Sequence, residues 1–136
     1  MFDSGVRAHH VATVLCAPLL RATPNSLVVT VSVHVGEAHH GVAYSMAKAA
    51  DDRLAAATAA QLERDGVASV ALHPGLVRTE GVMQFAEHLD LTDSQSPEGV
   101  GRVVAALASD RDVLALTGRA LDVAELAKRY NVDVTT

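Results

Sequence analysis

The chain has 136 residues and a mass of 14.2 kDa, enough for one domain or for part of a larger one. Apolar residues make up 49% of the sequence and aromatic residues 3%, so we expect a globular chain whose core is built from Val, Leu and Ala. The formal net charge is −5 and no basic run is present, which excludes the electrostatic footprint of a nucleic-acid-binding protein.

The amino-terminal segment places apolar side chains at helical spacing from Val6 to Arg21, with Pro18 expected to interrupt the helix near its end. It includes the apolar stretch Val11 to Leu20. No apolar run reaches the length of about 18 residues that a membrane span needs, and the basic charge before this stretch is too sparse for a signal sequence. Cys16 is the single cysteine, so no internal disulfide can form and a cytoplasmic location is expected.

The central part of the chain predicts two buried parallel strands joined by a long helix. The runs Leu27–Val33 and Val67–Leu72 are short and apolar on both faces, which is typical of such strands. Between them, the Ala-rich stretch Val42–Asp65 contains neither Gly nor Pro and predicts a helix that Gly66 stops.

The remaining third alternates in the same way. A mixed segment from Arg78 to Pro97 is expected to form a loop, and Pro97 begins a helix that reaches about Ala108. Leu116–Val123 predicts a third short strand and Ala124–Tyr130 a final helix. Helices that alternate with strands indicate an α/β fold with a parallel sheet and right-handed crossovers.

Three residues near the first strand carry the chemistry. Tyr44 and Lys48 are four apart at the start of the long helix, so they share one face. An ammonium beside a phenol favours the phenolate, and Tyr44 could then exchange a proton with a carbonyl or an alcohol. Ser32 closes the preceding strand, where its hydroxyl could polarise the same substrate oxygen. All three positions lie at the carboxyl edge of the predicted sheet, where open α/β sheets bind ligands.

Tyr-x-x-x-Lys alone is not specific, because a surface Tyr beside a solvated Lys gives the same pattern in an Ala-rich helix. The context is more specific: a Val-rich strand ending in Ser, then Tyr-Ser-Met-Ala-Lys-Ala-Ala at 44–50 and Pro-Gly-Leu-Val-Arg-Thr at 74–79. Together these segments resemble the carboxyl-terminal, catalytic half of a short-chain dehydrogenase/reductase. The resemblance extends over nearly the whole chain, from about Phe2 to Val132.

This resemblance implies that residues 1–136 are the carboxyl-terminal catalytic half of a Rossmann domain, with about three parallel strands, helices on both faces, and the amino-terminal cofactor-binding half absent. It implies NAD or NADP as the cofactor and a small alcohol or carbonyl as the substrate. Tyr44 would be the general acid/base, Lys48 would assist it and hold the nicotinamide ribose, and Ser32 would orient the substrate. The implied cofactor-binding residues are Tyr44, Lys48, Pro74, Gly75, Val77 and Thr79. The implied partner is a second copy or a complementing amino-terminal half, with no nucleic acid and no membrane.

Three features depart from the family pattern. Ser32 precedes Tyr44 by 12 residues and is followed by Val33, whereas the family's catalytic serine commonly stands one residue further from the tyrosine. Gly5 occupies the position where the family usually has an Asn that anchors a proton-relay water. No Gly-rich dinucleotide motif is present, and Gly99-Val100-Gly101 lies within a predicted helix. We therefore expect the chain alone to be inactive, with weak nucleotide affinity and an unpaired edge at its first strand.

Other interpretations remain open at this point. Glu37, His39 and His40, in the loop before Tyr44, are either substrate contacts or solvated side chains. The substrate itself would be set by the segment Met83–Asp93 and by the missing amino-terminal half. The sequence has seven histidines, but it has neither a Cys cluster nor a His-Glu-x-x-His motif, so no metal site is expected. Ser32 lacks the Gly-x-Ser-x-Gly surroundings of a hydrolase nucleophile. The alternative function is a non-catalytic remnant that acts as an oligomerisation or regulatory module through its helix pair.

Overall fold

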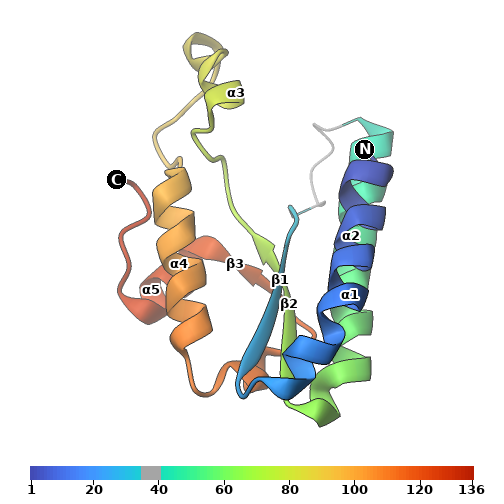
Figure 1. The fold of residues 1–136 in the computed structure, drawn as a ribbon. Coiled ribbons are helices and arrows are strands. Elements are labelled where there is room, and N and C mark those ends of the chain that lie inside the picture. Colours follow the sequence, from blue (N-terminus) through green and yellow to red (C-terminus); the bar gives the residue numbers. More distant parts are fainter. Residues whose placement is uncertain (35–40) are drawn as a thin grey trace.

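The computed structural model describes residues 1–34 and 41–136 of the chain (Figure 1). The helices and strands in chain order are a π-helical turn at Asp3–Arg7, α1 at Ala8–Ala22, β1 at Ser26–Val31, α2 at Val42–Leu62, β2 at Val67–His73, α3 at Glu80–Met83, α4 at Pro97–Ser109, β3 at Ala120–Asp122 and α5 at Val123–Tyr130. Short 3₁₀ turns occupy Glu63–Asp65, Ala86–His88 and Val113–Leu116.

The strands form one parallel sheet in the order β1-β2-β3. The β1–β2 register runs from Ser26 opposite Val67 to Val31 opposite Leu72. Parallel neighbours require a crossover on one face of the sheet, which α2 supplies between β1 and β2, and α4 between β2 and β3. The predicted α/β fold with a partial, three-stranded Rossmann-type sheet is confirmed.

Helices cover both faces of this sheet, as predicted. In Figure 1, α1 and α2 lie on one side of the strands, and α4 and α5 lie on the other. Strand β2 is buried along its whole length, because it lies between two strands and between two helical layers. Its alternate residues Ala68, Val70 and Leu72 join the main core with side chains from α4 and α5.

Helix α1 corrects one expectation, because it continues through Pro18 to Ala22. Pro18 removes a single N–H, and the carbonyl that loses its partner belongs to Val14, whose side chain is 55% exposed, so water can replace the bond. Polar side chains then satisfy the carbonyls at the helix end: Thr23 Oγ1 donates to Leu19 O at 2.9 Å and Ser26 Oγ to Leu20 O at 2.7 Å.

The third strand and the loop before it also differ from expectation. The strand covers only Ala120–Asp122, because a 3₁₀ turn occupies Val113–Leu116 and Gly118 follows with a φ of 78°, which extended backbone does not allow. The expected loop from Arg78 to Pro97 contains the short helix α3. Gly66, with a φ of 76°, ends the helical run after α2, as predicted.

Strand β1 ends at Val31, two residues earlier than expected, although the Ser32 N–H continues the ladder by donating to Leu72 O at 2.8 Å. Within the part of the chain that the structure describes, β1 pairs with β2 alone, so its other edge has no strand beside it. None of the helices within residues 1–34 and 41–136 combines the length and apolar character that a bilayer crossing requires.

Candidate functional site

A hollow of about 530 Å³ opens at the carboxyl edge of β1 and β2, where α2 begins. Its lining includes every catalytic and cofactor-binding residue that the sequence predicted, although these residues come from parts of the chain up to 47 positions apart. The predicted residues in the lining are Ser32, Tyr44, Lys48, Pro74, Gly75, Val77 and Thr79. The fold therefore brings the Ser-Tyr-Lys group and the Pro-Gly segment into the lining of one hollow.

Ser32 lies directly after β1 and is only 3% exposed. Its Oγ donates to the backbone carbonyl of Lys48 at 2.9 Å, so the hydroxyl proton is held by the first turns of α2. A hydroxyl has a single proton, so Ser32 must rotate away from this carbonyl before it can donate to another oxygen.

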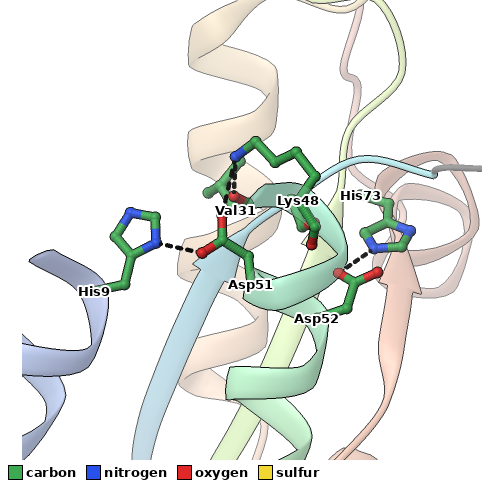
Figure 2. Close-up of polar contacts among 7 residues, drawn as sticks. His9, Val31, Lys48, Asp51, Asp52 and His73 are labelled. Atoms are coloured by element: carbon green, nitrogen blue, oxygen red, sulfur yellow. Dashed lines mark hydrogen bonds and ion pairs between the residues drawn. The ribbon is translucent and has the colours of Figure 1, made fainter. Parts of the chain in front are cut away.

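Tyr44 and Lys48 occupy successive turns at the amino-terminal end of α2, and the spacing of four places them together as predicted. The Lys48 Nζ lies 6.0 Å from the centre of the Tyr44 ring. Lys48 Nζ also donates to Val31 O, the last carbonyl of β1, at 2.9 Å. The ammonium is thus held at the strand end, as Figure 2 shows for its contact with Val31.

A buried carboxylate that sequence reasoning missed completes this arrangement. Asp51 lies one turn after Lys48, is 1% exposed, and accepts from Lys48 Nζ at 3.3 Å through Oδ2. Its Oδ1 accepts from His9 Nδ1 of α1 at 2.9 Å, so three side chains from two helices form one chain of contacts (Figure 2). One signal was available: Ala47, Asp51 and Ala55 share the buried face of α2, so a carboxylate interrupts an otherwise small-residue stripe.

A second His–Asp pair borders the hollow. His73, the last residue of β2, contacts Asp52 of α2, with Nε2 2.8 Å from Oδ1 (Figure 2). The His34 ring lies 6.2 Å from the His73 ring, centre to centre, and both line the hollow. These polar groups were also missed, and no local spacing marks them, because the contacts join residues far apart in the sequence.

The segment after β2 forms another wall of the hollow. Thr79 Oγ1 accepts from the Val82 N–H at 3.3 Å, so this hydroxyl caps α3 and its own proton remains available for another acceptor. Behind this wall, Gln95 is bridged to Val77, and its N–H donates to Leu76 O at 2.8 Å. The buried Oε1 of Gln95 has no hydrogen-bond partner among the residues that the structure describes.

Glu37, His39 and His40, the candidate substrate contacts, lie outside the described residues. Within residues 1–34 and 41–136, His, Cys, Asp and Glu side chains form no group of three or more that could hold a metal ion. Cys16 is exposed and unbonded.

Comparison with known proteins gives the family. The short chain dehydrogenase family model matches residues 1–90. The chain belongs to this family. Dehydrogenase/reductase SDR family member 1 of Mus musculus is 39% identical over an aligned length of 142 residues, gaps included. The alignment covers 94% of this chain and 45% of that protein. The chain therefore spans about half the length of this curated relative, and the predicted resemblance is confirmed.

Solved structures agree on the fold. A Xanthomonas campestris protein of known crystal structure is 20% identical, with a TM-score of 0.79 over 94% of this chain and 48% of its own. The 3-ketoacyl-(acyl-carrier-protein) reductase of Brucella melitensis, crystallised with NADH, is 21% identical, with a TM-score of 0.66 over 82% of this chain and 49% of its own. Both matches cover about half of the longer chain.

Proposed function

We propose that this chain carries the catalytic half of a cytoplasmic, NAD(P)-dependent oxidoreductase that interconverts a small alcohol and a carbonyl compound. The observation that supports it best is the convergence of Ser32, Tyr44 and Lys48 with the segment 74–79 around one hollow. Family membership favours the same activity, and the Brucella reductase was crystallised with NADH.

The residues around the hollow fit the nicotinamide end of such a cofactor. Two of the three N–H groups of Lys48 donate to Val31 O and Asp51, and among the described residues the third has no acceptor, so it can bind a ribose hydroxyl. Pro74, Gly75 and Val77 form a wall with little side-chain bulk, and the Thr79 hydroxyl can donate to a carboxamide. The volume of about 530 Å³ lies within the usual range of small-molecule sites. The sequence has no Gly-rich motif for the diphosphate, so that part of the cofactor requires residues beyond those of this chain.

The proposal assigns a role to each of the three residues, and their contacts are compatible with these roles. When bound, the nicotinamide supplies or accepts the hydride. Tyr44 donates a proton to the substrate oxygen during reduction and removes it during oxidation. The Lys48 ammonium stabilises negative charge on the Tyr44 side chain. Ser32 turns from the Lys48 carbonyl to donate to the substrate oxygen, so substrate binding breaks one hydrogen bond between β1 and α2.

Nucleotide titration tests this proposal. NADH and NADPH are titrated into the purified chain and into the full gene product that contains it, with binding followed by nucleotide fluorescence. We expect saturable binding to the full gene product, weakened by Lys48→Ala and unchanged by Lys128→Ala, which removes the other lysine of residues 1–136. Binding that Lys48→Ala leaves intact would contradict the proposed site. Micromolar binding to the chain alone would contradict the need for an amino-terminal half.

An oligomerisation module is the second candidate, favoured by exposed apolar side chains on the two helices of one layer. These side chains are Val11, Val14, Leu15 and Leu19 of α1 and Val42 and Met46 of α2, with Leu15 and Leu19 each more than 70% exposed. Light scattering measures the mass of the purified chain in solution. A dimer that Leu15→Lys/Leu19→Lys converts to a folded monomer would support this candidate, and a monomeric wild-type chain would exclude it.

A further inference from the structure

We propose that Asp51, supported by His9, is a positioning residue for Lys48 that fixes the ammonium at the end of β1 and leaves one N–H for the ligand. This inference rests on the proposed function for its purpose, but the contacts on which it depends belong to the chain itself. Neither Asp51 nor His9 belongs to the Ser-Tyr-Lys group, and neither lines the hollow.

The burial of the Asp51 carboxylate destabilises the folded state unless its contacts compensate for the lost hydration. The side chain of Asp51 is 2% exposed, on the buried face of α2, where the neighbours one turn away are Ala47 and Ala55. Removing a carboxylate from water costs several kcal/mol, and even a well-paired buried ion pair is seldom more stable than an apolar side chain of similar size. An apolar residue would pack on this face at lower cost, so the charge is explained by what it contacts.

The two oxygens of Asp51 contact two different side chains. Oδ2 lies 3.3 Å from Lys48 Nζ, and Oδ1 lies 2.9 Å from His9 Nδ1. A carboxylate only accepts, so His9 carries its proton on Nδ1 at this contact. The negative charge of Asp51 balances the positive charge of Lys48, and each oxygen of Asp51 has a donor.

These contacts restrict where the Lys48 ammonium can lie. A lysine side chain has four rotatable bonds and on its own would sample many positions in a hollow of this size. Acceptors on two different elements, Val31 O at the end of β1 and Asp51 Oδ2 on α2, define one position for Nζ. That position is 6.0 Å from the Tyr44 ring centre. Asp51 thereby reduces the disorder that a ligand would otherwise have to remove on binding Lys48.

His9 has a distinct part in this arrangement. It comes from α1, its side chain is 37% exposed, and it lies 42 residues before Asp51 in the sequence. Its ring prevents the Asp51 carboxylate from rotating, and it joins α1 to the end of α2 that carries Tyr44. The neighbouring His10 is exposed and makes no side-chain hydrogen bond among those found in the described residues, so it provides a matched control.

The test observes the Lys48 ammonium directly. The chain contains only two lysines, so ¹⁵N-lysine labelling gives at most two side-chain signals, and a signal that persists in Lys128→Arg belongs to Lys48. Ammonium protons held by two acceptors exchange slowly with water, so we expect a Lys48 correlation at neutral pH and low temperature and none from Lys128. Asp51→Asn should abolish it, whereas Asp52→Asn, which removes the neighbouring carboxylate bound to His73, should leave it unchanged.

His9→Gln should weaken the Lys48 signal and His10→Gln should not. Since His9 is partly exposed on α1, this variant remains informative if Asp51→Asn does not fold. A Lys48 signal that persists in folded Asp51→Asn, or that is missing from the wild type, would overturn the proposal. Equal Lys48 signals in His9→Gln and His10→Gln would show that His9 does not support Asp51.

A second measurement connects the pair to ligand binding. In the full gene product, Asp51→Asn should weaken nucleotide binding about tenfold, the effect of losing one well-placed charged hydrogen bond, while Asp65→Asn, at an exposed carboxylate paired with Arg21, should not. Unchanged binding in a variant whose Lys48 signal is lost would contradict the positioning role. The spectroscopic readout needs no nucleotide, so failure of the wild type to bind any nucleotide would contradict the proposed function and not the Asp51–Lys48 contact.

Discussion

Alanine substitutions at two glycines in the first two turns of α4, Gly99 and Gly101, should change the stability of the protein in opposite directions. At Gly99 an added Cβ would lie 2.5 Å from Val134 Cα and 2.6 Å from Val134 O, whereas at Gly101 it would meet nothing within 4 Å. The atoms beside Gly99 are backbone, so they cannot swing away as the end of a side chain would. Gly99→Ala must therefore displace the carboxyl-terminal segment from the start of α4.

The cost of that displacement follows from the contacts of the segment. Ser96 N donates to Val134 O at 2.8 Å, and Ser96 Oγ donates to Thr136 O at 2.8 Å. Each bond contributes about 0.5–1.5 kcal/mol, and Val134 also loses its partial burial against the core. The higher helix propensity of alanine offsets this loss by about 1 kcal/mol of folding free energy. We expect Gly99→Ala to lower the free energy of unfolding by about 1–3 kcal/mol and Gly101→Ala to raise it by about 1 kcal/mol.

Urea unfolding at pH 7, followed by far-ultraviolet circular dichroism, measures both changes. The carboxyl-terminal segment also contacts the stretch 74–79 that lines the hollow, because Arg78 Nη2 donates to Thr135 O. Gly99→Ala should therefore weaken nucleotide binding in the full gene product, and Gly101→Ala should not. Equal stabilities for the two variants would refute the packing of residues 131–136 on α4.

Three further predictions concern single side chains. Burial, together with its hydrogen bond to Asp110, raises the pKa of Tyr130 to about 12, so the folded state keeps a proton that the unfolded state loses above its ordinary pKa of 10. The stability that this contributes is complete below about pH 10 and is lost as the pH rises towards 12. In urea unfolding, the free energy of unfolding of Tyr130→Phe should therefore fall less steeply between pH 10 and 12 than that of the wild type. The same slope in both proteins would contradict this prediction. Thr79→Ala, which removes the cap on Val82 N, should cost about 1 kcal/mol in thermal melts and Thr79→Ser should restore it, so a fully stable Thr79→Ala would exclude the cap. Leu107→Ala, at a fully buried position, should lower the unfolding free energy by about 2–5 kcal/mol, and a loss below about 1 kcal/mol would contradict the packing of α4 on the sheet.

The sequence alone predicts the parts of this protein that depend on local pattern. The Ala-rich run gives α2, two short apolar runs give β1 and β2, and the spacing of four between Tyr44 and Lys48 places both on one face. The position of Ser32 follows from strand order, because parallel strands end at the same edge of a sheet.

What could not be predicted depends on contacts between distant residues. Nothing local to His9 indicates that it meets Asp51, since α1 and α2 must first pack side by side. Pro18 looked like an interruption because its lost hydrogen bond is visible in the sequence, while the exposure that makes the loss tolerable is not. The bond from Ser32 to the Lys48 carbonyl likewise appears only when the end of β1 meets α2.

Tyr44 is the proton-exchanging group of the proposed reaction, and its role can be measured directly. The full gene product is assayed for reduction of small carbonyl compounds with NADH and NADPH, in the wild type, in Tyr44→Phe and in Tyr130→Phe, which alters the other tyrosine of residues 1–136. We predict that Tyr44→Phe lowers kcat by about 10²–10⁴-fold while the protein still binds nucleotide, and that Tyr130→Phe retains activity. Activity in Tyr44→Phe within about twofold of the wild type would contradict the catalytic site proposed for this chain.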